Sequence, residues 1–132
     1  MLLNSDAINE DLGLLAIRLG GGGTMLLYHG WPKLIGFADR MDSFSDPLGL
    51  GPLVSLTLIT FAEVLCAALV ALGLWTRLAT IPLIIGMAVV VFIVQGDAPF
   101  AKKELAVIYL IAFVAIFLMG SGRYAVNRIS FR

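Results

Sequence analysis

Four long apolar runs, separated by short polar connections, dominate this chain of 132 residues. About 20 apolar residues in a helix cover the roughly 30 Å hydrocarbon core of a bilayer. The run Leu53–Trp75 reaches that length and is broken only by Glu63. With 60% hydrophobic and only 14% charged residues, the composition also disfavours a water-soluble domain. The sequence therefore predicts an all-α, polytopic membrane four-helix bundle with spans at about residues 12–29, 53–75, 78–94 and 104–121.

The connections between these runs are too short to contain a second domain, so residues 1–132 are expected to form a single integral membrane domain. A formal net charge of zero leaves no basic surface for nucleic acid, and the expected first partner is the lipid bilayer. The segment Met1–Asp11 carries acidic residues and no basic one, unlike a cleavable signal peptide. The first helix is therefore expected to stay in the protein as an anchor.

The orientation in the membrane is less strongly indicated. An even number of spans places both termini on one side, together with the short turn at Thr76–Arg77. Basic residues are divided four against four between the two sides, so the positive-inside rule gives a tie. The C-terminal tail carries Arg123, Arg128 and Arg132 with no acidic residue. This favours an inner-membrane protein with both termini in the cytoplasm.

The first connection, Gly30–Pro52, is the longest of the three. Charged residues of this connection fall on the other faces of a helix in which four apolar side chains recur at helical spacing. These apolar residues are Leu34, Phe37, Met41 and Phe44. This pattern is typical of a short amphipathic helix that lies in the membrane interface, here over about residues 33–44. A solvated loop with scattered hydrophobic side chains is the alternative.

Two charged residues lie inside apolar runs, Arg18 in the first and Glu63 in the second. An unpaired charge inside a bilayer costs at least a few kcal/mol. Counting about 1.5 Å per residue from the side of the termini places Arg18 roughly 10 Å deep and Glu63 roughly 18 Å deep. A long guanidinium side chain bridges much of that gap, so we expect an intramembrane charge pair. The pair would either fix the helix register or form a pocket in which Glu63 handles a proton or a polar head group.

A second group of polar and aromatic residues gathers at the opposite membrane face. His29 and Lys33 are one helical turn apart if the helix continues through Pro32, and Glu104 begins the fourth span at the same level. Such a group offers hydrogen-bond donors for carbonyl oxygens, a side chain that titrates near neutral pH, and aromatic walls for a planar ring. The candidate pocket for a quinone or another small ligand comprises Tyr28, His29, Lys33, Glu104 and Tyr109. Interface anchoring explains Tyr28 equally well.

The sequence gives little support for other cofactors. One cysteine, Cys66, allows no intramolecular dithiol chemistry, and its apolar neighbours favour inert packing. One histidine with scattered carboxylates has no metal-ligand spacing, and it excludes haem held by two histidines. We therefore expect no metal and no covalently bound cofactor. The glycines at 20–23 lack the flanking strand and Lys-Ser/Thr pair of a phosphate-binding loop, so helix packing is their expected role.

Taken in order, these motifs resemble the DoxX family of small four-helix membrane proteins. The resemblance extends from Leu12 to about Asn127. The family often has Ser and Asp after the last Gly-x-Gly, where this chain has Ala125 and Asn127. The matching pieces are Arg18-Leu19 with the following glycines, His29-Gly30-x-x-Lys33-Leu34, Glu63, Gly73-Leu74-x-Thr76-Arg77, Glu104-Leu105-Ala106 through Tyr109, and Gly120-x-Gly122-Arg123-Tyr124.

The resemblance implies a bundle of four helices and an association with membrane redox chemistry. Relatives include a subunit of thiosulfate:quinone oxidoreductase and proteins linked to thiol and oxidative-stress defence, while many members have no assigned activity. Two functions therefore stay open. The chain is either an integral subunit that anchors or assembles a protein partner and contacts a quinone, or a quinone-linked oxidoreductase component with its own turnover. The intramembrane charges alone would also fit a small-molecule transporter.

Overall fold

The computed structural model describes residues 2–126 of the chain, and within that range it contains helices and no strand. The all-α fold class is thereby confirmed. Three residues used in the arguments on orientation and family, Asn127, Arg128 and Arg132, lie outside the described part.

Four long helical segments make up the fold, and three of them contain a π-helical turn. The first is α1 (Glu10–Met25), which continues through η1 (Leu26–Gly30) into α2 (Trp31–Ile35) and is followed by α3 (Phe37–Arg40). The second comprises α4 (Pro52–Phe61), η2 (Ala62–Cys66) and α5 (Ala67–Leu72). The third comprises α6 (Thr76–Val89) and η3 (Val90–Val94), and the fourth is α7 (Phe100–Met119).

Two of these segments are long and apolar enough to cross a membrane. Pro52–Leu72 has 21 residues and a mean hydropathy of 2.3, and Thr76–Val94 has 19 residues and a mean hydropathy of 2.4. They correspond to the second and third predicted spans. The second ends at Leu72 rather than Trp75, because Gly73 adopts a left-handed conformation (φ 78°) and its N–H closes the last turn on Leu69 O at 2.9 Å. The complete four-span bundle stays a prediction.

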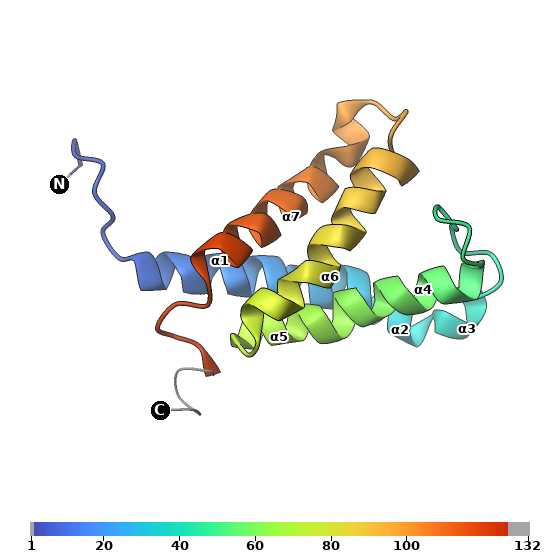
Figure 1. The fold of residues 1–132 in the computed structure, drawn as a ribbon, viewed down its shortest axis with the longest axis horizontal. Helices are drawn as coiled ribbons and strands as arrows, with labels where there is room; N and C mark the ends of the chain where they lie inside the picture. Colours follow the sequence, from blue (N-terminus) through green and yellow to red (C-terminus); the bar gives the residue numbers. More distant parts are fainter. Residues whose placement is uncertain (1, 127–132) are drawn as a thin grey trace.

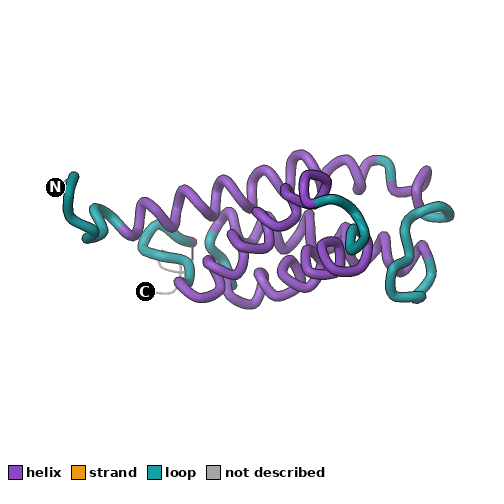
Figure 2. Tube along the Cα trace, turned by 90° about the horizontal axis from the view of Figure 1, so that it is seen from above, coloured by secondary structure: helices purple, strands orange, loops and turns teal. Residues whose placement is uncertain are grey.

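The helices form two pairs that lean away from each other (Figure 1). Helix α1 runs along α5, and η1 and α2 continue along η2 and α4, whereas α6 and α7 run side by side at an angle to this pair of segments. The pairs meet through α5 against α6 and α1 against α7, and the side chains buried there include Met25, Val70, Leu83, Phe113 and Ile116. Helix α1 begins, and α7 ends, at the same end of the molecule (Figures 1 and 2).

The glycine run packs against the second segment at one position. A Cβ on Gly22 would lie 2.8 Å from Ala67 O and 2.9 Å from Ala71 N, so α1 and α5 approach each other closely only because this residue has no side chain. Gly20 and Gly23 have nothing within 4 Å of an added Cβ. The packing interpretation therefore holds for Gly22 and not for these two neighbours.

The long first connection is helical in its first half. Pro32 lies in the first turn of α2, directly after the π-helical turn η1, and the helical segment continues past it to Ile35. Gly36 (φ −98°, ψ 20°) then separates α2 from α3. Helix therefore forms over much of residues 33–44, as the apolar spacing predicts, while its position in the membrane interface stays a prediction. Asp46 organises the following loop, because its carboxylate accepts hydrogen bonds from Leu50 N, Gly51 N and Ser55 Oγ at 2.8–2.9 Å.

Candidate functional site

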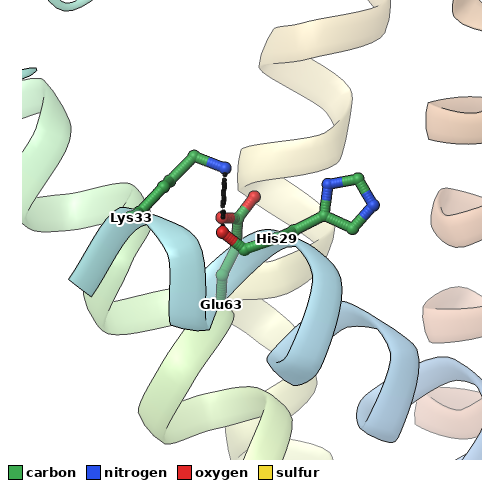
Figure 3. A network of polar contacts seen from close by, with 3 residues as sticks. All are labelled: His29, Lys33 and Glu63. Carbon is green, nitrogen blue, oxygen red and sulfur yellow. Dashed lines mark hydrogen bonds and ion pairs between the residues drawn. The ribbon is translucent and has the colours of Figure 1, made fainter. Parts of the chain in front are cut away.

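A buried ion pair links the first and second helical segments. Lys33 Nζ lies 2.7 Å from Glu63 Oε2, and the side chains are only 18% and 4% exposed. The same ammonium group donates a hydrogen bond to the backbone carbonyl of His29 at 3.3 Å (Figure 3). The positive charge of α2 is thus shared between a carboxylate and a carbonyl oxygen of the π-helical turn before it.

The backbone around this pair is positioned by one close approach. A Cβ on Gly30 would lie 2.6 Å from the carbonyl carbon of Glu63 and 2.9 Å from Val64 N, closer than any side chain fits. Gly30 ends η1 and Glu63 lies in η2, so two π-helical turns meet at this contact. A π-helical turn inside an α-helix is often found at a functional site. Here the two turns bring Lys33, one turn beyond Gly30, within reach of Glu63.

The predicted charge pair between Arg18 and Glu63 is wrong. Arg18, only 1% exposed, donates instead to backbone carbonyls of Val70 (3.2 Å), Ala71 (3.3 Å), Ser121 and Tyr124 (2.8 Å). The reason is helix register. Glu63 lies level with Gly30, which is 12 residues beyond Arg18, or about 18 Å along a helix.

An aromatic contact extends the site towards α7. The ring of His29 meets the ring of Tyr109 edge-on, with centroids 5.3 Å apart and an interplanar angle of 85°. Tyr109 in turn stacks on Phe113 at 6.0 Å, and its hydroxyl lies 3.0 Å from Thr24 Oγ1. Figure 3 shows the imidazole pointing away from the ion pair. His29 therefore touches the ion pair through its backbone and the aromatic cluster through its ring.

The structure brings together three of the five predicted pocket residues. His29, Lys33 and Tyr109 are joined by the contacts above, and Glu63 joins them. Tyr28 is 73% exposed, and Glu104 is exposed near the start of α7, more than a turn before Tyr109. These two residues lie outside the cluster.

Two threonines at the site were missed by sequence reasoning. The Thr24 hydroxyl accepts a hydrogen bond from the Tyr109 hydroxyl. Nothing in the sequence around Thr24 distinguishes it from other small residues of a membrane helix. Thr60 lies one turn before Glu63 and is 6% exposed. Its hydroxyl has no hydrogen-bond partner within the part of the chain that the structure describes. Its spacing of three residues from Glu63 was the available signal, because such residues share a helix face.

Within residues 2–126, no cluster of three or more His, Cys, Asp or Glu side chains is arranged to hold a metal ion. The side chains of the site offer several chemical groups of their own. An ammonium group and an imidazole can donate hydrogen bonds, a carboxylate can exchange a proton, and the rings of Tyr109 and Phe113 present flat apolar faces.

A comparison with known families covers most of this site. The model of the DoxX family matches residues 13–96, from α1 to the end of the third helical segment. The chain belongs to the DoxX family. Arg18, His29, Lys33 and Glu63 all lie inside the matched region, whereas Tyr109 lies beyond it. Together with the two apolar helices, DoxX membership indicates a small membrane protein. Neither the curated proteins nor the solved structures gave a match to the chain.

Proposed function

We propose that this DoxX protein is an integral membrane subunit of a redox-associated system, which anchors or assembles a protein partner and contacts a quinone. The observation that carries the proposal is the buried ion pair between Lys33 and Glu63. Two charges removed from water are costly even when paired, and ionisable residues inside membrane segments generally belong to ligand sites or proton pathways. A purely structural contact between η1 and η2 would not need them.

The neighbours of the pair suit a quinone head group. Lys33 and His29 would donate hydrogen bonds to a carbonyl oxygen, and Tyr109 would offer a planar apolar wall. Glu63 would exchange the proton that accompanies reduction or oxidation of the ring. The electrons would come from a partner protein, because a chain with one cysteine and one histidine has neither a dithiol nor a pair of haem ligands.

The proposed topology has four spans in the inner membrane and both termini in the cytoplasm. In addition to the two apolar helices, α1 with η1 and the 20-residue α7 would cross the bilayer. Their packing supports this: α1 lies along α5, and α7 lies along α6. A reporter fused to the C-terminus should be active only when the reporter works in the cytoplasm. Activity of an outside-only reporter at that position would reverse the orientation and leave the fold unchanged.

Copurification tests the quinone contact. The protein is extracted in mild detergent, and the lipid-soluble quinone that remains bound is quantified for the parent, Glu63→Gln and Lys33→Met. We expect each substitution to reduce bound quinone by about tenfold, the effect of losing one charge-assisted contact. Glu104→Gln is the matched control, since it neutralises an exposed carboxylate outside the cluster, and it should retain quinone.

Three outcomes would contradict the proposal. Quinone that is absent from the parent, or that stays bound in both variants, would leave a structural subunit without a quinone contact. Reduction of added quinone by the purified protein alone, with a thiol as donor, would instead establish an oxidoreductase with its own turnover.

A further inference from the structure

Two cavities meet at the end of the molecule opposite to the ion pair, where α1 begins and α7 ends. The larger has a volume of about 780 Å³ and is bounded by the first turns of α1 and α6 and by the segment that follows α7. The smaller has a volume of about 330 Å³ and lies between η2, α5 and α6. Trp75 and Leu78 line both cavities. The two cavities are therefore neighbours along the surface of α6.

The larger cavity has charges of both signs. Arg77 and Arg123 line it together with Glu10 and Asp11. Arg77 is held at the end of α7, because its Nε donates to Phe117 O at 2.9 Å and its guanidinium lies over the Phe117 ring at 5.9 Å. The backbone N–H of Arg123 donates to Asp11 Oδ1 at 2.9 Å. Balanced charges on fixed elements fit a ligand that also carries both charges.

A helix N-terminus, the first turn of α6, borders this cavity. Thr76, Arg77 and Leu78 line the cavity. In the described structure this 14-residue helix begins with no side-chain cap and no acidic residue in its first turn. The N–H groups of such a turn and the helix dipole together attract an anion.

The same helix turn contains a buried hydroxyl group. Thr76 is only 3% exposed, and its Oγ1 has no hydrogen-bond partner among residues 2–126. A buried hydroxyl without a partner is costly, so such groups generally have a ligand or water to bond.

The wall of the cavity is anchored to the core. Arg18 donates to the carbonyls of Ser121 and Tyr124 on one side and of Val70 and Ala71 on the other. It thereby ties the segment after α7 to α5. The polar cavity is thus a fixed feature of this end of the molecule.

The smaller cavity is apolar throughout. Its lining includes Leu65, Leu69, Leu78, Ile81 and Pro82. It starts next to the polar cavity and extends along α5 and α6, away from the end of the molecule. In a membrane protein this arrangement places a polar pocket at head-group depth and an apolar groove beneath it.

We propose that the two cavities form one binding site for a phospholipid with an amine-bearing, zwitterionic head group. The phosphate binds the first turn of α6 through its backbone N–H groups, the Thr76 hydroxyl and the Arg77 guanidinium. The ammonium group lies beside Glu10, and an acyl chain occupies the apolar cavity. The polar cavity lies at the other end of the molecule from Lys33, and the apolar cavity is lined by neighbours of Glu63 in η2 but not by Glu63 itself. The proposed lipid site therefore shares no residue with the proposed quinone contact and is tested independently of it.

Trp75 provides a reporter for this site, because it lines both cavities and the only other tryptophan is Trp31. In a Trp31→Phe background, Trp75 fluorescence is titrated with dihexanoyl phosphatidylethanolamine. We expect a saturable change in the parent and about tenfold weaker binding in Arg77→Gln, which loses a charge-assisted contact. Thr76→Val should weaken binding, and Thr76→Ser should restore it. Lys102→Gln, which removes an exposed cation at the other end, is the matched control.

Folding is checked separately by thermal unfolding of each variant. Thr76→Val removes a hydroxyl that has no partner within the described structure, so it should unfold no earlier than the parent. A loss of lipid binding in this variant therefore reports the site rather than the fold.

Three results would overturn the proposal. Equally tight binding of phosphoethanolamine, which has no acyl chains, would establish a free phosphate site without the apolar extension. Equally tight binding of dihexanoyl phosphatidylglycerol would remove the role of the amine. A fluorescence change that is the same in Arg77→Gln and Thr76→Val as in the parent would be non-specific association.

Discussion

Gly30 and Glu63 lie so close together that no side chain fits between their backbones. This contact between η1 and η2 sets the register of the first two helical segments, and with it the relative positions of Arg18, Lys33 and Glu63. It places Lys33 beside Glu63, in the middle of the second segment, and Arg18 beside the last turn of that segment.

Substitution of Gly30 by alanine should therefore be strongly destabilising. The added methyl group would collide with backbone atoms of Glu63 and Val64, which cannot rotate away. We expect a loss of about 1–3 kcal/mol or more in the free energy of unfolding, as in other overpacked cores. Gly23→Ala is the control. It places a methyl group on α1 where nothing lies within 4 Å, so alanine's better helix propensity should leave stability equal or slightly higher. The measurement is unfolding in detergent followed by circular dichroism.

The ion pair should show strong coupling in a double-mutant cycle. Glu63→Gln or Lys33→Met alone leaves one charge without its partner, and each should cost about 3 kcal/mol. The double variant removes both charges and should be closer to the parent than either single variant. If the two single effects simply add in the double variant, Lys33 and Glu63 do not interact in the folded protein.

Arg18 should behave differently, because its partners are carbonyl oxygens rather than a carboxylate. Arg18→Met leaves four backbone carbonyls without this donor and should lower the free energy of unfolding. Arg18→Lys should not restore the lost stability, since an ammonium lacks the planar fork that reaches several acceptors. The effects of Arg18→Met and Glu63→Gln on the free energy of unfolding should add to within about 0.5 kcal/mol. A larger coupling energy would restore the charge pair predicted from the sequence.

The loop before α4 should loosen in acid. The hydrogen bond from Ser55 Oγ, together with backbone N–H groups, lowers the pKa of Asp46 below its ordinary value. A carboxylate with a lowered pKa stabilises the folded loop above its unfolded pKa, and this stabilisation is lost as the pH falls through the folded pKa. The protection of the amides of residues 49–51 against hydrogen exchange should therefore fall below about pH 4 in the parent. In Asp46→Asn the same amides should exchange with no such acid transition, and an unchanged transition there would assign it to another group.

The apolar runs were sufficient to predict the helical class and both membrane-length helices, because hydrophobic length is a local property of the sequence. Helix register is not local. Counting inward from Asp11 and from Trp75 assumed that the first two segments start at the same depth, but Arg18 lies level with Val70 and Ala71, near the end of the second segment. Nor does the sequence show that backbone carbonyls would satisfy Arg18, since every residue has one.

The candidate site was predicted only in part, because local spacing is visible in the sequence and helix register is not. His29 and Lys33 lie one turn apart in the sequence, so their proximity followed from helical spacing. Tyr109 was named as an aromatic wall of the candidate pocket, and the structure places its ring edge-on against His29. Glu104 was placed at the level of His29 but is exposed on α7, so level alone did not determine which side chains converge.

The hydrogen bonds of Arg18 also impose an order on the folding of this chain. Arg18 belongs to the first helical segment, whereas Ser121 and Tyr124, which accept two of its hydrogen bonds, follow the fourth segment and are synthesised 103 and 106 residues later. The guanidinium therefore has an incomplete set of acceptors until α7 and the segment after it have been made. The segment after α7 completes the hydrogen bonding of Arg18 only once all four helical segments have been synthesised.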